Sequence, residues 1–133
     1  MPMITIKEKE YSYNEDQVLN FNEGLVGLPE MRKAVLIPMD EYAPFCWLAS
    51  VDDEKIRFVV VNPSEIFAGY DVDSVESNMG TTKTLTIVKI SSDWTKTTVN
   101  LRAPIFIDTA AKRGAQHILT ESNYSLAEPI PQN

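Results

Sequence analysis

The apolar runs of this chain are short, rich in β-branched residues and interrupted by proline or glycine, and none keeps a helical period for long. Runs of about four to eight such residues are typical of strands, whereas a helix needs about ten or more. The clearest run is Asn-Leu-Arg-Ala-Pro-Ile-Phe-Ile-Asp at residues 100–108. Because Pro104 cannot donate a ladder hydrogen bond, it confines this run to a sheet edge, a bulge or a strand start.

Strands joined by short turns account for most of the remaining chain. Residues 45–49 and 56–61, separated by the acidic stretch 50–55, predict an antiparallel hairpin. Further strands are expected at residues 4–7, 18–21, 34–37, 66–72, 84–90, 100–108 and 116–120. Single helical turns are expected at 74–79, closed by Gly80, and at 109–113. The pattern favours a mainly β fold, a small barrel or sandwich.

A glycine-rich loop is predicted at residues 24–29, Gly-Leu-Val-Gly-Leu-Pro. Gly24 and Gly27 allow one or two positive φ angles, so that the apolar side chains between them can pack inward. For Gly24, Gly27, Pro29 and Pro104 we expect a role in backbone geometry rather than direct contact with a partner.

Length and composition indicate one folded domain spanning residues 1–133. The hydrophobic fraction of 44% is that of a globular protein, and the single cysteine, Cys46, excludes an internal disulfide. No secretory signal and no apolar stretch of membrane-spanning length is evident in the sequence. We therefore expect a cytoplasmic protein that does not enter the membrane.

Acidic residues are concentrated in the first part of the chain. Residues 1–80 carry 15 Asp and Glu against 6 Lys and Arg, whereas residues 81–133 carry 4 against 6. An acidic surface repels nucleic acid, and it favours either a basic partner or simple solubility. The basic residues of the second part are scattered, so direct nucleic-acid binding is not expected.

The residue types present give little support for a catalytic function. His117 is the single histidine, so a Cys46–His117 pair is the one thiol dyad available, and both residues lie in strand-like runs typical of structural positions. No glycine-rich phosphate loop and no serine elbow occurs. Residues 71–82 begin like a calcium loop, but Glu76 and Thr82 replace the required glycine and glutamate. We therefore expect neither enzymatic activity, nor a cofactor, nor a metal.

Three blocks of residues, which follow one another along the chain, form the most specific pattern in the sequence. The first block is Phe-Asn-Glu-Gly-Leu-Val-Gly-Leu-Pro at residues 21–29. The second comprises Pro44, Phe45, Trp47, Leu48, Ser50, residues 58–61, Pro63 and Tyr70. The third comprises Asn100, Leu101, Ala103, Pro104, Ile105, Arg113, Gln116, Leu119 and Tyr124. Each block alone is a weak signal, but their joint order and spacing are specific, and in them the chain resembles the bacterial flagellar assembly factor family FliW. Asn100 and Pro104 are marks of the third block, and we expect both to be structural.

This resemblance implies a small, flattened, antiparallel β-barrel-like protein without enzymatic activity. It implies binding to flagellin in the cytoplasm, and, once flagellin has been exported, binding to the translational regulator CsrA. That regulator represses flagellin translation by binding RNA. A protein of this family would bind the regulator away from its RNA groove and so relieve the repression. The resemblance thus implies a chaperone-like protein that couples flagellum assembly to the translation of flagellin.

Two acidic segments are our candidates for partner contact, because charge singles them out. They are the predicted turn Asp52, Asp53 and Glu54, and the segment that contains Tyr70, Asp71, Asp73 and Glu76. Solvated loops are the structural alternative for both segments. Two other functions stay open at this point: a small calcium- or carboxylate-metal-binding β module built on these acids, and a β-barrel that binds a ligand in an internal apolar pocket.

Overall fold

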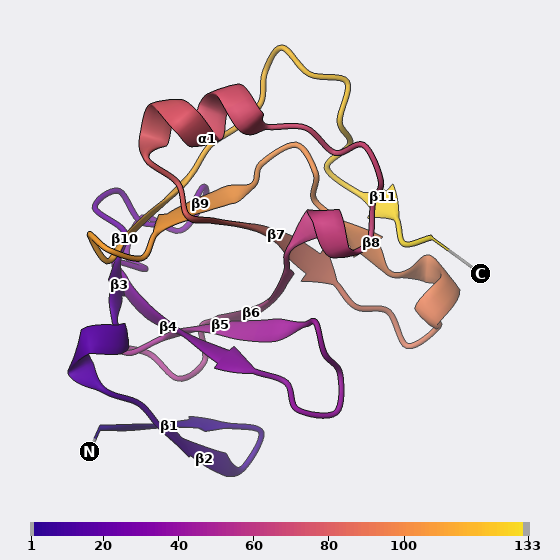
Figure 1. Cartoon of the computed structure of the whole chain (residues 1–133). Helices are drawn as coiled ribbons and strands as arrows, with labels where there is room; N and C mark the ends of the chain where they lie inside the picture. The colour runs from indigo at the N-terminus through magenta and orange to yellow at the C-terminus, as the bar shows by residue number, and fades with distance from the viewer. Residues whose placement is uncertain (1, 132–133) are drawn as a thin grey trace.

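The computed structural model describes residues 2–131, and its strands wrap into a closed barrel with a hairpin and a helix on the outside (Figure 1). The strands are β1 Met3–Ile6, β2 Lys9–Ser12, β3 Leu19–Asn20, β4 Lys33–Pro38, β5 Cys46–Ser50, β6 Arg57–Val61, β7 Lys83–Lys89, β8 Thr98–Val99, β9 Ile105–Asp108, β10 Arg113–Gln116 and β11 Glu128–Pro129. The helix is α1 Asp73–Met79, and 3-10 turns occur at η1 Glu15–Gln17, η2 Pro63–Glu65 and η3 Trp94–Lys96.

The barrel wall follows the strand order β7-β6-β5-β4-β3-β10-β9. Pairing of β9 with β7, at Lys83↔Ile107 through Leu85↔Ile105, closes the ring. Neighbouring wall strands are antiparallel except β10 and β3, which run parallel through the single pair Arg113↔Asn20. At its other end β7 also pairs with β8, which in turn pairs with β11. The mainly β, barrel-like fold expected from the sequence is therefore confirmed.

Apolar side chains fill the inside of the barrel. The main core cluster combines Leu19, Phe21, Leu25, Met31, Ala34, Leu48, Val60, Leu85, Ile105 and Ile107. Alternate residues of the same strands point outward, and there they are covered as well. Hairpin β1–β2 packs Ile4 and Ile6 over the outer side of β4 and β5, against Val35, Ile37 and Ala49. Strands that are buried on both sides explain why β4 and β6 are continuous apolar runs rather than alternating ones.

A third cluster covers the outside of β6, β7 and β8. It joins Val61, Val88, Val99 and Leu101 to partly buried Ile66, Phe67, Tyr70 and Tyr124 from the connections. Helix α1 packs against β9, on the side of the barrel opposite hairpin β1–β2 (Figure 1). The described chain contains no helix that is long and apolar enough to span a membrane.

Several local predictions are confirmed. The hairpin over residues 45–61 forms β5 and β6, with a turn at 51–56. The single helical turn at 74–79 is α1, and Gly80 ends it in the left-handed conformation at φ 65°. Gly24 and Gly27 have φ angles of 67° and 77°. Of the alternatives for Pro104, the strand start applies, since β9 begins at Ile105. The strand predicted over residues 100–108 is therefore confirmed only from Ile105 onward, because residues 100–104 form a turn that the Asn100 side chain holds.

Three local predictions are wrong. Residues 66–72 form no strand, because Ile66 and Phe67 donate their N–H groups back to Pro63 O and Gly69 turns the chain at φ 80°. Residues 109–112 form a hairpin turn rather than a helical turn, with Lys112 at φ 55°. The last predicted strand, 116–120, ends at Gln116, because His117 and Leu119 donate to the loop carbonyls of Pro104 and Arg102. Strand β2 was not predicted, since its Lys-Glu-Tyr-Ser sequence is mostly exposed.

Candidate partner interface

The acidic turn at residues 52–54 is held by a single buried serine. Ser50 Oγ accepts the backbone N–H groups of Asp52 and Asp53, each at 3.2 Å, and is 3% exposed. Asp53 Oδ1 then accepts Lys55 N at 3.0 Å. The backbone of this turn is thus fixed locally, while the side chains of Asp52, Asp53 and Glu54 are exposed to solvent. The turn presents negative charge on a rigid support.

The second acidic segment anchors α1 to the barrel. Tyr70 donates its hydroxyl to Leu101 O at 2.7 Å, and its ring stacks at a tilt on Tyr124, with the centroids 4.6 Å apart. Asp71 N donates to the Tyr124 hydroxyl at 2.9 Å. Thr84, which lies on β7, donates its hydroxyl to Glu76 of α1. Tyr70 and Glu76 therefore have structural partners, whereas the carboxylates of Asp71 and Asp73 are exposed.

The hydroxyl of Tyr70 stays protonated far above neutral pH. Burial of the ring is the main cause of its raised pKa, and the nearby Tyr124 and Glu76 raise the pKa further. A neutral hydroxyl is required for the hydrogen bond that Tyr70 donates to Leu101 O. This bond is therefore maintained at physiological pH.

The two acidic segments lie on separate surfaces. Asp52 shares a shallow hollow with Lys33 and Lys112, near β3 and the β9–β10 turn. Asp73 and Glu76 line a hollow together with Thr84 of β7. The structure thus places the two acidic segments apart rather than in one continuous site, and two lysines stand beside Asp52 of the first segment.

The one thiol dyad that the sequence permits is not assembled. The Cys46 side chain packs against the core cluster inside the barrel, and its burial raises the pKa of the thiol, with Lys83 opposing the effect. The ring of His117 lies instead against Phe106, with the ring centroids 6.5 Å apart, and His117 is exposed. A protonated, core-facing thiol is a poor nucleophile. Residues 2–131 also hold no group of three or more His, Cys, Asp or Glu that could bind a metal ion.

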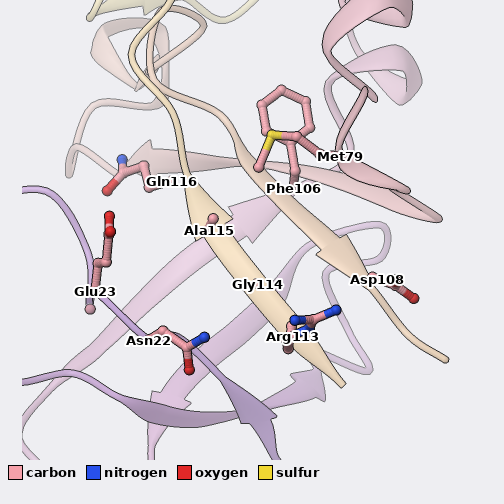
Figure 2. A pocket seen from close by; sticks show the side chains of 10 residues that line it. Asn22, Glu23, Met79, Phe106, Asp108, Arg113, Gly114, Ala115 and Gln116 are labelled. Atoms are coloured by element: carbon pink, nitrogen blue, oxygen red, sulfur yellow. The ribbon is translucent and has the colours of Figure 1, made fainter. Parts of the chain in front are cut away.

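A groove that sequence reasoning missed lies between the glycine-rich loop and β10 (Figure 2). Its volume is about 330 Å³. The side chains of Glu23, Phe106, Arg113 and Gln116 border it, and Met79 of α1 lines it as well. The signal in the sequence was the joint presence of the first and third blocks, because the structure brings these two blocks together here.

Gln116 connects the two blocks. Its Oε1 accepts Val26 N at 2.8 Å, and its Nε2 donates to Ala103 O at 3.0 Å. Gly114, on the same strand, lies so close to the Phe21 ring that a side chain at this position would collide with it. Gly24 approaches the backbone of Pro29 equally closely. Asn100 Oδ1 accepts Arg102 N and Ala103 N, which sets the turn before Pro104.

These observations define a class of protein: a closed β-barrel whose interior is filled by apolar side chains and whose hollows lie on the outer surface. The chain belongs to the FliW family, whose profile, "FliW protein", matches residues 3–130. The flagellar assembly factor FliW of Clostridium beijerinckii is 30% identical, with 98% of each chain covered. That of Bacillus subtilis is 31% identical over 91% of this chain and 90% of its own. The crystal structure of a flagellar assembly factor FliW matches with a TM-score of 0.85 and 27% identity, covering 98% of this chain and 99% of that one.

Proposed function

We propose that this protein is a non-enzymatic flagellar assembly factor that acts in the cytoplasm as a single domain. It binds flagellin, and it antagonises the RNA-binding translational regulator CsrA when flagellin has been exported, so that flagellin translation resumes. The observation that carries the proposal is the family match over residues 3–130, together with relatives named as flagellar assembly factors across nearly their whole length. The filled barrel interior supports action through the outer surface rather than through an internal ligand.

The acidic surfaces support binding to a basic partner. The exposed carboxylates of the first segment, Asp52, Asp53 and Glu54, stand on a hydrogen-bonded turn. Asp73 is the first residue of α1, and Asp71 precedes the helix. A protein of net charge −7, docked beside an RNA-binding surface, adds a field that repels incoming phosphate. This field extends over about 8 Å at physiological salt. Antagonism of the regulator would thus combine a change in its shape with electrostatic repulsion of RNA.

Competition between the two partners tests the proposal. The purified protein is immobilised, loaded with CsrA and challenged with increasing amounts of flagellin, and the released regulator is measured. We expect flagellin to displace the regulator, and we expect the regulator to displace flagellin in the reverse experiment. If the protein retains neither partner, the proposed function is wrong.

The electrostatic part has a separate test. Asp52→Asn, Asp53→Asn, Asp71→Asn and Asp73→Asn are combined in one variant, and the matched control carries four Glu→Gln changes at Glu8, Glu10, Glu30 and Glu41. The quadruple Asp variant should displace RNA from the regulator less effectively than the control variant. Displacement that is equal in both variants and independent of salt would contradict the electrostatic contribution.

A further inference from the structure

A second hollow adjoins the groove of Figure 2, and the two run along one side of α1. The second hollow, about 340 Å³, is lined by Val75 of α1 and by His117 and Ile118 of the segment that follows β10. Val75 and Met79 are four residues apart on α1 and therefore lie on the same side of the helix. The Phe106 ring, which lines the first hollow, contacts the His117 ring of the second. We call the two hollows together the α1 groove.

The α1 groove is apolar at its base and acidic at its rim. Phe106 is buried in the floor, while Met79 is 37% and Ile118 is 43% exposed. Because these side chains line the same groove, they form a grouped apolar surface rather than scattered exposed residues. The carboxylate side chains that line the two hollows are Glu23, Asp71, Asp108 and Glu121, and the single Lys or Arg in the lining is Arg113. An occupant should therefore combine apolar side chains with a surplus of positive charge.

The backbone of the groove wall disfavours an occupant that adds a β-strand. Leu119 N donates to Arg102 O at 2.7 Å, and His117 N donates to Pro104 O at 3.0 Å, so these groups already have partners within the chain. Recognition must then depend on side chains. A helix that places apolar residues three and four positions apart suits a groove of this kind.

We propose that the α1 groove binds a cationic amphipathic helix of a partner protein, with apolar anchors that contact Met79, Phe106 and Ile118. Basic side chains of the helix pair with the rim carboxylates, of which Glu23, Asp71 and Glu121 are exposed. The groove is distinct from the acidic turn at 52–54 and adds an apolar component that charge alone does not provide. The inference rests on the proposed function for the identity of the natural partner, but not for the chemistry of the site.

The test uses a labelled model peptide of about 14 residues, roughly four helical turns, composed of Leu and Lys with the leucines three and four positions apart. A scrambled peptide of the same composition measures attraction by charge alone. Fluorescence anisotropy gives the affinity of both peptides for the wild type, for Met79→Glu and Ile118→Glu, and for a control variant. The control is Ile90→Glu, because Ile90 is 48% exposed and lies on the β7–β8 connection, outside both hollows.

We expect the amphipathic peptide to bind the wild type more tightly than the scrambled one, and we expect Met79→Glu and Ile118→Glu to weaken this binding by about tenfold or more. Ile90→Glu should leave it within about twofold. Equal affinities for the two peptides, or equal losses in all three variants, would overturn the inference. The three substitutions are at exposed positions, and circular dichroism checks that each variant folds.

Two further measurements separate the remaining outcomes. Analytical ultracentrifugation shows whether the wild type self-associates and whether Met79→Glu abolishes this; such a result would make a second copy the occupant and would overturn the helix proposal. The charge of the rim is tested with Glu23→Lys plus Glu121→Lys, which should weaken peptide binding more than Glu10→Lys plus Glu41→Lys. Failure to retain flagellin or CsrA bears on the proposed function, whereas failure to discriminate the model peptides bears on the groove.

Discussion

Both residues of the β1–β2 turn have a strained backbone. This two-residue turn places Lys7 at φ 50° and Glu8 at φ 69°, a conformation that side chains other than Asn, Asp and Gly rarely adopt. Glu8→Gly removes the contact between Cβ and backbone, and it should stabilise the protein by roughly 0.5–1 kcal/mol after the larger chain entropy of glycine is subtracted. Lys7 is left in place, because its ammonium lies 5.5 Å from the centroid of the Trp47 ring.

The matched control for this prediction is Glu10→Gly, in the middle of β2. Glycine in a strand interior costs about 0.5–1 kcal/mol, so this variant should be less stable than the wild type. Urea denaturation of the two variants gives both values. A loss of stability in Glu8→Gly as large as that in Glu10→Gly would show that the turn is not strained.

Gly114 is a residue where space rather than φ limits the side chain. A Cβ at this position would overlap the Phe21 ring in the barrel core. We predict that Gly114→Ala destabilises the protein by about 1–3 kcal/mol, the range of overpacked cores. Phe21→Leu in the same chain should reduce this loss, which a double-mutant cycle measures. Additive losses in the double variant would argue against the contact.

At the level of the elements, the sequence predicts strands well where pairing and burial agree. The hairpin over 45–61 was predictable because two apolar runs flank a polar turn, and α1 because Gly80 closes it. Residues 66–72 misled the prediction because their apolar side chains are buried without any strand pairing. Ile66, Phe67 and Tyr70 pack on the outside of β6–β8 from a loop, and in sequence this burial gives the same pattern as a strand.

The α1 groove could not be predicted, because its walls come from four distant parts of the chain. Loop 22–24, α1, β9 and the segment from β10 onward meet only through the register of β9 with β7 and β10. Alternation of residues along one strand does not specify which other strand lies beside it. The acidic residues were visible in the sequence, but their division between two surfaces depended on the closed barrel.

The attachment of α1 to the barrel should depend on pH. The pKa of Tyr70 is raised in the folded state, whereas the unfolded side chain ionises near its usual value of about 10. The contribution of the neutral hydroxyl is therefore complete below about pH 10 and decreases as the pH rises above it. Unfolding free energies measured between about pH 9 and 11 should fall, and Tyr70→Phe should reduce the slope.

Tyr42→Phe is the control for this alkaline effect, since Tyr42 is 64% exposed. Tyr70→Phe also removes the hydrogen bond to Leu101 O, which costs about 1 kcal/mol at neutral pH. Hydrogen exchange should show this loss as faster exchange in α1 before the barrel strands are affected. If Tyr42→Phe reduced the fall in unfolding free energy at alkaline pH as much as Tyr70→Phe does, burial of Tyr70 would not be the cause of that fall.

For the whole molecule, charge determines the rate of association more than the strength of the final complex. The net charge is −7, and the acidic surplus lies in residues 1–80, which supply both acidic segments. If the protein binds the regulator as proposed, long-range attraction between this field and the regulator's RNA-binding surface should raise the association rate constant. Salt screens such attraction over a Debye length of about 30 Å at 0.01 M and about 8 Å at 0.15 M.

We therefore predict that the association rate constant with CsrA falls by about tenfold or more between about 0.01 M and 0.15 M salt, while the dissociation rate constant changes by less than about threefold. Stopped-flow fluorescence measures both. Met79→Glu and Ile118→Glu add charge but remove apolar contact, so if the regulator supplies the helix that occupies the α1 groove, these two variants should raise the dissociation rate. A salt effect confined to dissociation would mean that the acidic surfaces form close contacts rather than steer the approach of the partner.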